Sequence, residues 1–413
     1  MKLSVLAIAS VALMAGSGMA VAQQGQTVKI AMIEGLSGPF GNVGNNQLKS
    51  WQYVASQLTP DENPAGVKFE IVGMDSKSSP QEAVNLLKSA EDQGFHYVTQ
   101  GNGSNVAIPL SEAVGKYDER NPGKEIIYIN YAAVDPALTN DKCNYWHFRV
   151  DADTTMKMKA LAHFIKSQPS KNFYLMNQNY SHGHQVAEFF KKYIAEDKPD
   201  SKIAGEDFTA LGQVKDFAPY VAKIKASGAD SVVTGNWGQD FTLLVKAMND
   251  AGLSLPIYAY YAGVSGTPTA LAQGKFSEIY QISYGHSNYE GRIGELEKGF
   301  KEKYDDDFYT FAIYNALVSL SHAMAAVKST DPAKVAAELE DMKFKGFNGE
   351  SYFRKADHQL QQGLWIAKWE KTSEKYPYSV ENTGYTFAPV SYIPLTEAST
   401  PTTCKMKRPS SKS

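Results

Sequence analysis

The sequence lacks an excess of basic residues. Its 413 residues carry 41 Lys and Arg against 44 Asp and Glu, which gives a formal net charge of −3 at pH 7. Proteins that bind nucleic acids need basic side chains to neutralise phosphates, so we expect no nucleic-acid partner. Long apolar runs are also lacking after the first 22 residues, where no stretch reaches the roughly 18 apolar residues of a spanning helix. We therefore expect no membrane span.

The N-terminal stretch MKLSVLAIASVALMAGSGMAVA has the pattern of a secretory signal peptide. Lys2 precedes an apolar segment from Leu3 to Met14, and Ala20-Val21-Ala22 forms a small-residue cleavage signal. The apolar part is too short to cross a membrane. We expect residues 1–22 to be removed, leaving an exported chain of about 390 residues, which corresponds to two domains at roughly 100–200 residues each.

Cysteine is scarce, with only Cys143 and Cys404 in the whole chain. Two cysteines so far apart in the sequence do not make a metal site by themselves, because zinc needs four ligands. In an exported protein with an even number of cysteines, a disulfide is the better interpretation. We predict a Cys143–Cys404 disulfide that anchors the C-terminal tail.

The exported chain alternates strand-like and helix-like segments in two series. The first runs from VKIAMI through VKFEIVGM and HYVTQ to EIIYIN, with a helix start at Ser79-Pro80-Gln81-Glu82, which is a capping box. The second begins near residue 150 and includes NFYLM, SVVTGN and IYAYY, separated by segments of helical periodicity. Such alternation predicts parallel sheets with right-handed crossovers, so the fold class is α/β with two doubly wound units.

The pattern changes after about residue 280. IYQISYGH is typical of a strand, and helical stretches follow, including one that starts at Asp331-Pro332. The segments ESYFRK and LWIAKWE, near Gly363, are predicted to form a β-hairpin. The tail over 391–413 is rich in Pro, Ser, Thr and Lys, and we expect it to be poorly packed except at Cys404.

Three loops leave the carboxyl ends of strands in the first unit, where open parallel sheets bind ligands: GLSGPFGNVG, GNGSNVAIP and YAAVDPAL. The glycines of the first loop match neither nucleotide-binding fingerprint. The other two loops run into predicted helix starts, whose free N–H groups favour an anion such as a carboxylate. The alternative is that Ser104 and Asp135 are ordinary helix N-caps and that the glycines only serve turns.

The second unit places aromatic residues at or after its strand ends. His182, Trp237, Tyr260 and Tyr261 lie there, and Tyr309 precedes a later helix. They are candidates for the opposite wall of a cleft, although single aromatic residues more often serve packing. The i, i+2 spacing of His182 and His184 does not place both on one helical face, and no third ligand accompanies them, so we expect no metal.

Signatures of catalysis are lacking as well. Gly263-Val264-Ser265-Gly266-Thr267 breaks the G-x-S-x-G pattern, and no H-E-x-x-H or assembled S-x-x-K set is found. Neither cysteine has a histidine in a recognisable catalytic setting. We expect a protein that is not an enzyme and needs no cofactor, and the rival interpretation is a secreted α/β hydrolase.

Taken together, these segments resemble the type I periplasmic solute-binding proteins of ABC importers, in the branched-chain amino acid (Leu/Ile/Val) binding group. VKIAMIEGLSGPFGNVG resembles the first strand and S-G-P loop of that group, SSPQEAVNLLKSAEDQGFHYVTQG its P-x-x-A-V helix and next strand, and YAAVDPALT its A-A-T-x-P-x-L-T loop. The resemblance covers nearly all of the exported chain. It implies a monomer in the periplasm with two lobes joined by three hinge strands, which closes on a solute and delivers it to a membrane permease.

The resemblance also implies a division of the chain. The N-terminal lobe would contain 23–149 and about 283–350, and the C-terminal lobe would contain 150–282 and about 351–390. The glycine-rich loop would face the ligand, its glycines allowing the backbone to approach the solute and the other lobe. A sensor-type receptor that signals without transport remains an alternative within this class.

Site residues follow from the resemblance position by position. Ser104 and Ala132 fall where the family holds the ligand carboxylate, and Val134 replaces a usual Ser or Thr. Where the family commonly has a glutamate for the ligand ammonium, this chain has Ala262 or, with a one-residue slip, Tyr261. The full predicted set is Phe40, Asn102, Ser104, Ala132, Val134, His182, Trp237, Tyr261, Ala262 and Tyr309.

The missing glutamate changes the expected ligand. An ammonium left unpaired in a closed cleft would cost several kcal/mol. We therefore predict a small carboxylate solute without an α-ammonium, an aromatic acid in the first place, whose far end contacts His182 or a tyrosine hydroxyl. The alternative is a branched-chain amino acid whose ammonium is paired by Asp240, Asp207 or backbone carbonyls.

Overall fold

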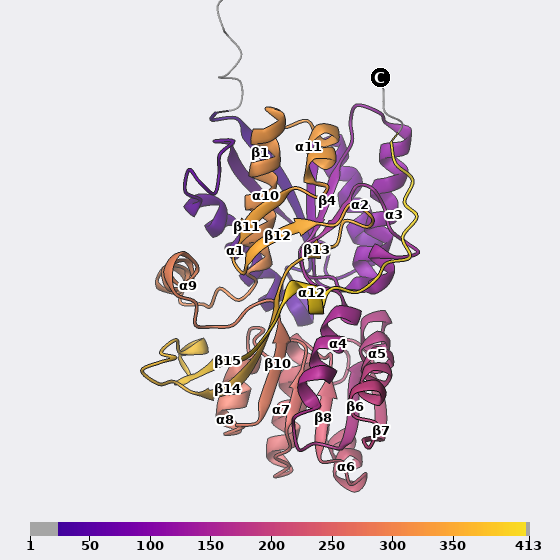
Figure 1. The fold of residues 1–413 in the computed structure, drawn as a ribbon, viewed down its shortest axis with the longest axis vertical. Coiled ribbons are helices and arrows are strands. Elements are labelled where there is room, and N and C mark those ends of the chain that lie inside the picture. Colours follow the sequence, from indigo (N-terminus) through magenta and orange to yellow (C-terminus); the bar gives the residue numbers. More distant parts are fainter. Residues whose placement is uncertain (1–23, 410–413) are drawn as a thin grey trace, which may run out of the picture.

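The computed structural model of the protein describes residues 24–409, so the predicted signal peptide over 1–22 lies outside the described residues. Two lobes follow one another along the longest axis of the molecule, each built on its own parallel sheet (Figure 1). This arrangement agrees with the predicted α/β class and its two doubly wound units. No helix in the described part of the chain is long and apolar enough to cross a membrane.

The first lobe contains a five-stranded parallel sheet in the order β2-β1-β3-β4-β5. Its strands are β1 (Thr27–Glu34), β2 (Lys68–Asp75), β3 (Tyr97–Gln100), β4 (Ile127–Asn130) and β5 (His147–Arg149). Because β1 lies between β2 and β3, the order of winding reverses at β1 and β3, and a ligand site is expected beyond the carboxyl ends of these strands.

Three helices connect these strands: α1 (Gly41–Gln57), α2 (Pro80–Asp92) and α3 (Ser104–Arg120). Ser79 caps α2 as predicted, since its hydroxyl accepts from the Glu82 backbone N–H at 3.3 Å. The reciprocal bond of a capping box is not formed, because the Ser79 backbone N–H donates to the Ser76 carbonyl oxygen at 2.8 Å. Helix α1 begins at Gly41, because the turn η1 (Gly38–Phe40) leads directly into it. Gly44 is required there, as a Cβ on it would lie 2.1 Å from the Gly35 carbonyl oxygen.

The second lobe contains a seven-stranded sheet in the order β15-β14-β10-β9-β8-β6-β7. Its parallel strands are β6 (Asn172–Gln178), β7 (Lys202–Thr209), β8 (Ser231–Thr234), β9 (Ile257–Ala259) and β10 (Ile279–Ser283). The connecting helices are α4 (Thr154–Ile165), α5 (Ser181–Asp197), α6 (Ala218–Ala226), α7 (Gly238–Asp250) and α8 (Thr267–Gln273). Here the winding reverses at β6 and β8, so the two switch points face each other across the space between the lobes.

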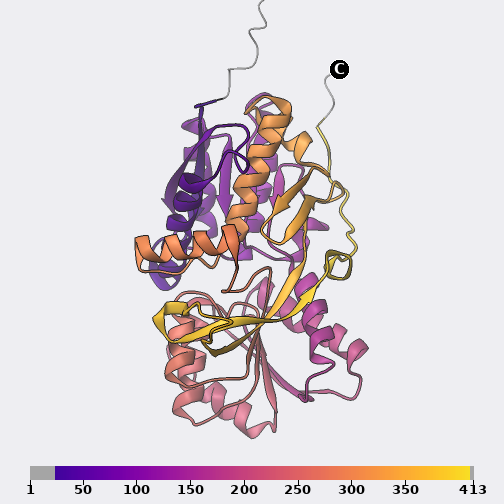
Figure 2. The ribbon, with the colours of Figure 1, turned by 60° about the vertical axis from the view of Figure 1, so that its left-hand side comes forward.

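After β10 the chain returns to the first lobe. It forms α9 (Gly291–Tyr304), α10 (Ala312–Val327), α11 (Pro332–Leu339) and a small antiparallel sheet of β11 (Lys343–Gly346), β12 (Gly349–Phe353) and β13 (Leu360–Gln361). The strands β14 (Leu364–Lys371) and β15 (Tyr385–Ile393) then extend the second sheet in antiparallel fashion, with η3 (Val380–Asn382) between them. Figure 2 shows α9 along the lower edge of the first lobe, opposite the ribbon of β14 and β15.

The predicted hairpin near Gly363 is wrong. The strand β12 pairs with β11 and β13 in the first lobe, whereas β14 pairs with β10 and β15 in the second. The chain therefore passes between lobes at 362–363, about ten residues later than the boundary expected near 350. Alternating apolar residues mark both segments as strands, but they do not record which sheet each strand joins.

The chain passes between the lobes at three places, over 150–153, 284–290 and 362–363. A fourth connection comes from the tail, which leaves β15, forms α12 (Leu395–Ala398) and runs up the first lobe to the Cys143–Cys404 disulfide (Figure 1). The tail is better packed than expected over 391–400, where it ends β15 and forms α12, whereas 401–409 form no helix or strand and are exposed or half-buried. Its backbone carbonyls accept from Lys159 Nζ at 3.0 Å and from Arg354 Nη1 at 2.7 Å, and Ala398 is fully buried.

Candidate functional site

A cavity lies between the lobes, at the carboxyl ends of both parallel sheets. Its empty space is about 650 Å³, including the part open at its mouth. Residues from the two lobes line it in similar numbers. The first lobe contributes Val43, Gln47, Gly101, Asn102, Gly103, Ser104, Ala132, Ala133, Val134, Tyr309 and Thr310, and the second lobe and its connections contribute Tyr180, His182, Trp237, Tyr261, Gly263, Val264, Gln281, Ser283 and Tyr284.

The structure brings most of the predicted site residues into this cavity. Asn102, Ser104, Ala132, Val134, His182, Trp237, Tyr261 and Tyr309 all line it. Two predicted residues do not. Ala262 is fully buried in the core of the second lobe, and Phe40 lies behind Trp237, its ring centroid 4.2 Å from that of Trp237. At the position where the resemblance allowed a one-residue slip, Tyr261 is the residue that faces the cavity.

The first-lobe wall contains the N-terminus of α3. Gly103 is the N-cap of this helix, with φ of +84°, and Ser104 is its first residue. The Ser104 hydroxyl accepts from the Asp135 backbone N–H at 3.2 Å, so Ser104 is not the N-cap that the alternative interpretation assumed. The unpaired N–H groups of the first turn, together with the positive end of the helix dipole, favour a carboxylate at this point.

The loop after β4 has a different role from the one predicted. Asp135 does cap the next element, since its carboxylate accepts from the Ala137 backbone N–H at 2.9 Å. That element, η2 (Pro136–Thr139), is only a short 3₁₀ turn, so it adds little dipole. The anion preference of the cavity therefore depends on α3.

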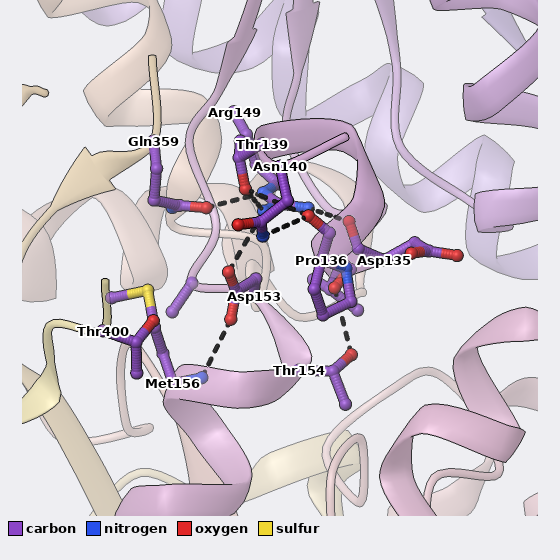
Figure 3. A network of polar contacts seen from close by, with 12 residues as sticks. Asp135, Pro136, Thr139, Asn140, Arg149, Asp153, Thr154, Met156, Gln359 and Thr400 are labelled. Atoms are coloured by element: carbon purple, nitrogen blue, oxygen red, sulfur yellow. Dashed lines mark hydrogen bonds and ion pairs between the residues drawn. The ribbon is translucent and has the colours of Figure 1, made fainter. Parts of the chain in front are cut away.

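A buried arginine fixes the same loop in place (Figure 3). Arg149 donates to the Asp135 carbonyl oxygen at 2.5 Å, to the Thr139 hydroxyl, to Asp153 Oδ2 at 3.3 Å and to Gln359 Oε1 at 2.6 Å. These partners come from the loop after β4, from the first connection between the lobes and from the segment before the third. Since Arg149 is fully buried and its donors have partners, it positions the cavity wall and is not available to the ligand.

On the second-lobe wall, His182 contributes ring surface. Its Nδ1 is 3.2 Å from the Thr154 hydroxyl, and its Nε2 is 3.3 Å from the Gly235 carbonyl oxygen. Burial lowers the pKa of His182 to about 4, so the ring is neutral at pH 7. Because both nitrogens already have partners, the predicted hydrogen bond from His182 to the far end of the ligand has no free atom to make it.

Aromatic rings make up much of the remaining wall. The Trp237 indole N–H donates to the Tyr180 hydroxyl at 2.9 Å, which leaves the face of the indole for packing. The Tyr261 hydroxyl donates to the Ala132 carbonyl oxygen of the other lobe at 3.1 Å. Tyr309 approaches the Ser265 hydroxyl at 3.3 Å. The bonds of Tyr261 and Tyr309 connect the lobes around the cavity, so the structure is a closed form.

Within the described residues, no Asp, Glu, Lys or Arg side chain lines the cavity. The two carboxylates considered as partners for a ligand ammonium are engaged elsewhere. Asp240 accepts from the Gly212 backbone N–H at 2.9 Å and from Gln178 Nε2 at 2.8 Å, and Asp207 forms an ion pair of 2.7 Å with Lys223.

One buried ion pair lies behind this wall. Lys157 Nζ is 2.8 Å from Asp151 Oδ2, and it lies 5.2 Å from the Tyr261 ring centroid and 5.3 Å from that of Tyr284. Burial lowers the pKa of Lys157 and raises that of Asp151 to about 6. The pair lies beside the first connection between the lobes, and its opposite charges leave little net field in the cavity.

Several lining residues were missed in the sequence, among them Gln47, Tyr180, Gln281, Ser283, Tyr284 and Thr310. A signal existed for two of them, because Gln281 and Ser283 are polar residues two apart in an otherwise apolar strand, which places both on one face. Gln47 gave no such signal, since it reaches the cavity from the middle of α1, where its side-chain oxygen accepts from Asn102 Nδ2 at 2.6 Å.

The glycine-rich loop behaves differently from the expectation. None of its glycines lines the cavity, which is reached instead by Val43 of the loop and by Gln47 beyond it. The loop does approach the other lobe closely, since a Cβ on Gly212 or Gly238 would lie 3.0 Å from the Phe40 ring. The main role of this loop is therefore to contact the other lobe, and it contributes little to the wall of the cavity.

Comparisons with known proteins agree with this geometry. The model of the periplasmic binding protein family matches residues 27–374. The Leu/Ile/Val-binding protein homolog 4 of Brucella melitensis is 30% identical over 402 residues, which cover 93% of this chain and 94% of the relative.

Two solved structures are similar in fold. The closed form of the leucine-, isoleucine-, valine-, threonine- and alanine-binding protein from Brucella ovis has a TM-score of 0.81 at 27% identity and covers 93% of this chain and 100% of its own. A solute-binding protein of an ABC transporter from R. palustris, in complex with 4-hydroxybenzoate, has a TM-score of 0.74 at 18% identity and covers 89% of this chain and 97% of its own. At that identity the second likeness shows the fold alone.

Proposed function

Since this chain belongs to the periplasmic binding protein family, within its branched-chain amino acid group, we propose that its cavity captures a small carboxylate solute that lacks an α-ammonium group. The protein is a solute-binding protein and not an enzyme, and the family works with the membrane permease of an ABC transporter. Export through the signal peptide at 1–22 and one-to-one binding with closure of the lobes are parts of the same proposal.

The observation that carries the proposal is the charge of the cavity wall. The N-terminus of α3 at Gly103 and Ser104 offers N–H donors to an anion, whereas the lining residues of the described chain include no carboxylate. An α-amino acid would bring an ammonium next to its carboxylate into this wall, where a charge without a partner costs several kcal/mol.

The rings around the cavity favour an aromatic acid in particular. Trp237, Tyr261 and Tyr309 present ring surface to the cavity, and their polar atoms already have partners. A contact between two aromatic rings stabilises a complex by about 0.5–1.5 kcal/mol beyond the contribution of the apolar area that it buries. The R. palustris protein of similar fold was solved with 4-hydroxybenzoate, which fits a ligand of this class in such a fold.

A branched-chain amino acid is the second candidate. This candidate is supported by the two similar proteins from Brucella, whose names describe them as a Leu/Ile/Val-binding protein homologue and as a leucine-, isoleucine-, valine-, threonine- and alanine-binding protein. In this cavity its ammonium would have to use neutral oxygens, such as the Ala132 carbonyl or Gln281 Oε1, which already accept at 3.1 Å and 2.5 Å.

Calorimetry decides between the two. The exported chain is titrated with benzoate, 4-hydroxycinnamate, leucine, isoleucine and valine under identical buffer conditions. We expect micromolar binding of at least one aromatic acid and none of leucine. Micromolar binding of leucine with none of the acids would overturn the proposal, and mass spectrometry of the solute that co-purifies from the native host gives an independent answer.

A further inference from the structure

A second, smaller chamber adjoins the cavity on the side of α9. Its empty space is about 370 Å³, and Gly263, Gln281, Ser283 and Tyr309 line both spaces, so they form the partition between them. Beyond this partition, the wall of the chamber includes Glu297 of α9. The chamber thus adjoins the cavity, and a solute that reaches both spaces must pass this partition.

Glu297 has no cationic partner. Its side chain is 2% exposed, and none of the ion pairs among the described residues includes it. The groups that act on its carboxyl are the Tyr289 backbone N–H, Asp307, Lys298, Lys301 and the hydroxyls of Tyr289 and Tyr378. Lys301 is already paired with Asp307 at 2.7 Å and donates to the Ser379 carbonyl oxygen at 2.6 Å. Burial therefore raises the pKa of Glu297 well above its usual range, because it disfavours the charged carboxylate.

His286 lines the same chamber and has one ring nitrogen without a partner. Its Nδ1 accepts from the Asn288 backbone N–H at 3.1 Å, so the proton of the neutral ring lies on Nε2, which makes no hydrogen bond to a described residue. Burial lowers the pKa of His286 to about 4, and the ring adds no positive charge at pH 7. Two buried polar groups, Glu297 and His286, therefore face this space.

The remaining walls suit a cation. Tyr309, Phe311, Tyr378 and Phe387 contribute aromatic rings, whose faces attract a positive charge. The chamber is formed by both lobes, since Glu297 comes from α9 and Phe387 from β15, which lie opposite each other in Figure 2. Closure of the lobes thus encloses the chamber beside Glu297, and a cation that enters with the solute would offset the cost of a buried carboxylate.

We propose that this chamber is a second subsite of the cleft and takes an ammonium group at the far end of the solute, opposite Glu297. The inference rests on the proposed function for the place of the carboxylate, at the start of α3. The solute is then an ω-amino carboxylic acid, with an apolar or aromatic middle between its two charges. On binding, Glu297 loses its proton to the buffer and pairs with the ammonium.

Three matched pairs of ligands test this subsite without assuming a spacing between the charges. They are 4-aminobutyrate with butyrate, 6-aminohexanoate with hexanoate, and 4-(aminomethyl)benzoate with 4-methylbenzoate. We expect one amino member to bind at least tenfold more tightly than its partner and to release about one proton, measured by calorimetry in buffers of different ionisation enthalpy. Equal affinity within all three pairs overturns the subsite.

Two variants of α9 complete the experiment. Glu297→Gln is expected to abolish the preference for the amino member while affinity for its partner stays within twofold. Glu295→Gln changes an exposed residue of the same helix and should keep the preference. A preference that survives Glu297→Gln overturns the inference, and circular dichroism with thermal unfolding shows that both variants are folded.

The design also separates this inference from the proposed function. If no carboxylate of any pair binds, the proposed function fails, and the chamber is then tested with n-butylamine and benzylamine alone. Either amine should raise the unfolding temperature of the wild type but not that of Glu297→Gln. Without such a difference, the chamber is not a cation subsite.

Discussion

Phe40 is expected to control closure of the lobes for any solute. It lies in the η1 turn of the first lobe, is 4% exposed, and its ring centroid is 4.2 Å from that of Trp237 in the second lobe. Together with Val43 and Val264 these rings form a separate apolar cluster between the lobes. Because Phe40 does not line the cavity, its substitution changes closure without removing a wall of the site.

The size of the effect follows from what opening would expose. Burial of a Phe side chain contributes roughly 1.5–3 kcal/mol, and an aromatic pair adds about 0.5–1.5 kcal/mol. Part of the Phe40 burial comes from Val43 in its own lobe and is kept on opening. We therefore expect Phe40→Ala to weaken binding by about 2–3 kcal/mol, which is roughly a 30- to 160-fold rise in Kd.

Trp237→Ala is the matched comparison, since this residue belongs to the same contact and also lines the cavity. Calorimetry should show that Phe40→Ala weakens aromatic and aliphatic carboxylates by the same factor. Trp237→Ala should weaken the aromatic ones by a further 0.5–1.5 kcal/mol or so. Small-angle scattering of Phe40→Ala should show a larger open fraction at partial saturation. An unchanged Kd in Phe40→Ala would refute the assignment of this contact to closure.

Three other outcomes are expected. The Cys143–Cys404 disulfide joins residues 261 positions apart, and its reduction should lower the free energy of unfolding by up to about 5 kcal/mol. The measurement is a lower urea midpoint of unfolding. An unchanged midpoint would show that the reduced tail keeps its place without the bond. The pKa of His182 is about 4 in the folded protein and about 6.5 in the unfolded chain, so the unfolded chain binds more protons between these two pH values. The free energy of unfolding should therefore decrease by about 2 kcal/mol when the pH is lowered from 7 to 5. His182→Gln should lack this part of the pH dependence in urea titrations. Gly44→Ala should lower the unfolding temperature strongly, because the added Cβ would lie 2.1 Å from a backbone oxygen. Gly41→Ala should lower it much less, because the corresponding distance is 3.1 Å. Equal losses of unfolding temperature would contradict the steric argument.

The sequence alone was enough to predict the features that depend on neighbours three or four residues apart. The Ser79 capping box, the Asp331 cap and the strand–helix alternation were predicted because each one is a spacing along the chain. The sheets followed, since alternation of this kind has few solutions other than a parallel sheet. The resemblance added the two-lobe plan and ten predicted site residues, of which eight, from Asn102 to Tyr309, line the cavity.

Only the tertiary structure decided what surrounds the ligand site. Whether Tyr261 or Ala262 faces the cavity and whether Phe40 contacts solute or Trp237 depend on segments more than 100 residues apart in the sequence. The sheet that β12 joins depends on its pairing with β11 and β13, which the alternation of apolar residues does not specify. The chamber beside Glu297 depends on the same long-range packing, because its walls come from both lobes. The spacing of residues along the chain predicts hydrogen bonds within a turn. A cavity between lobes exists only after closure has brought its walls together, and no periodicity along the chain predicts that packing.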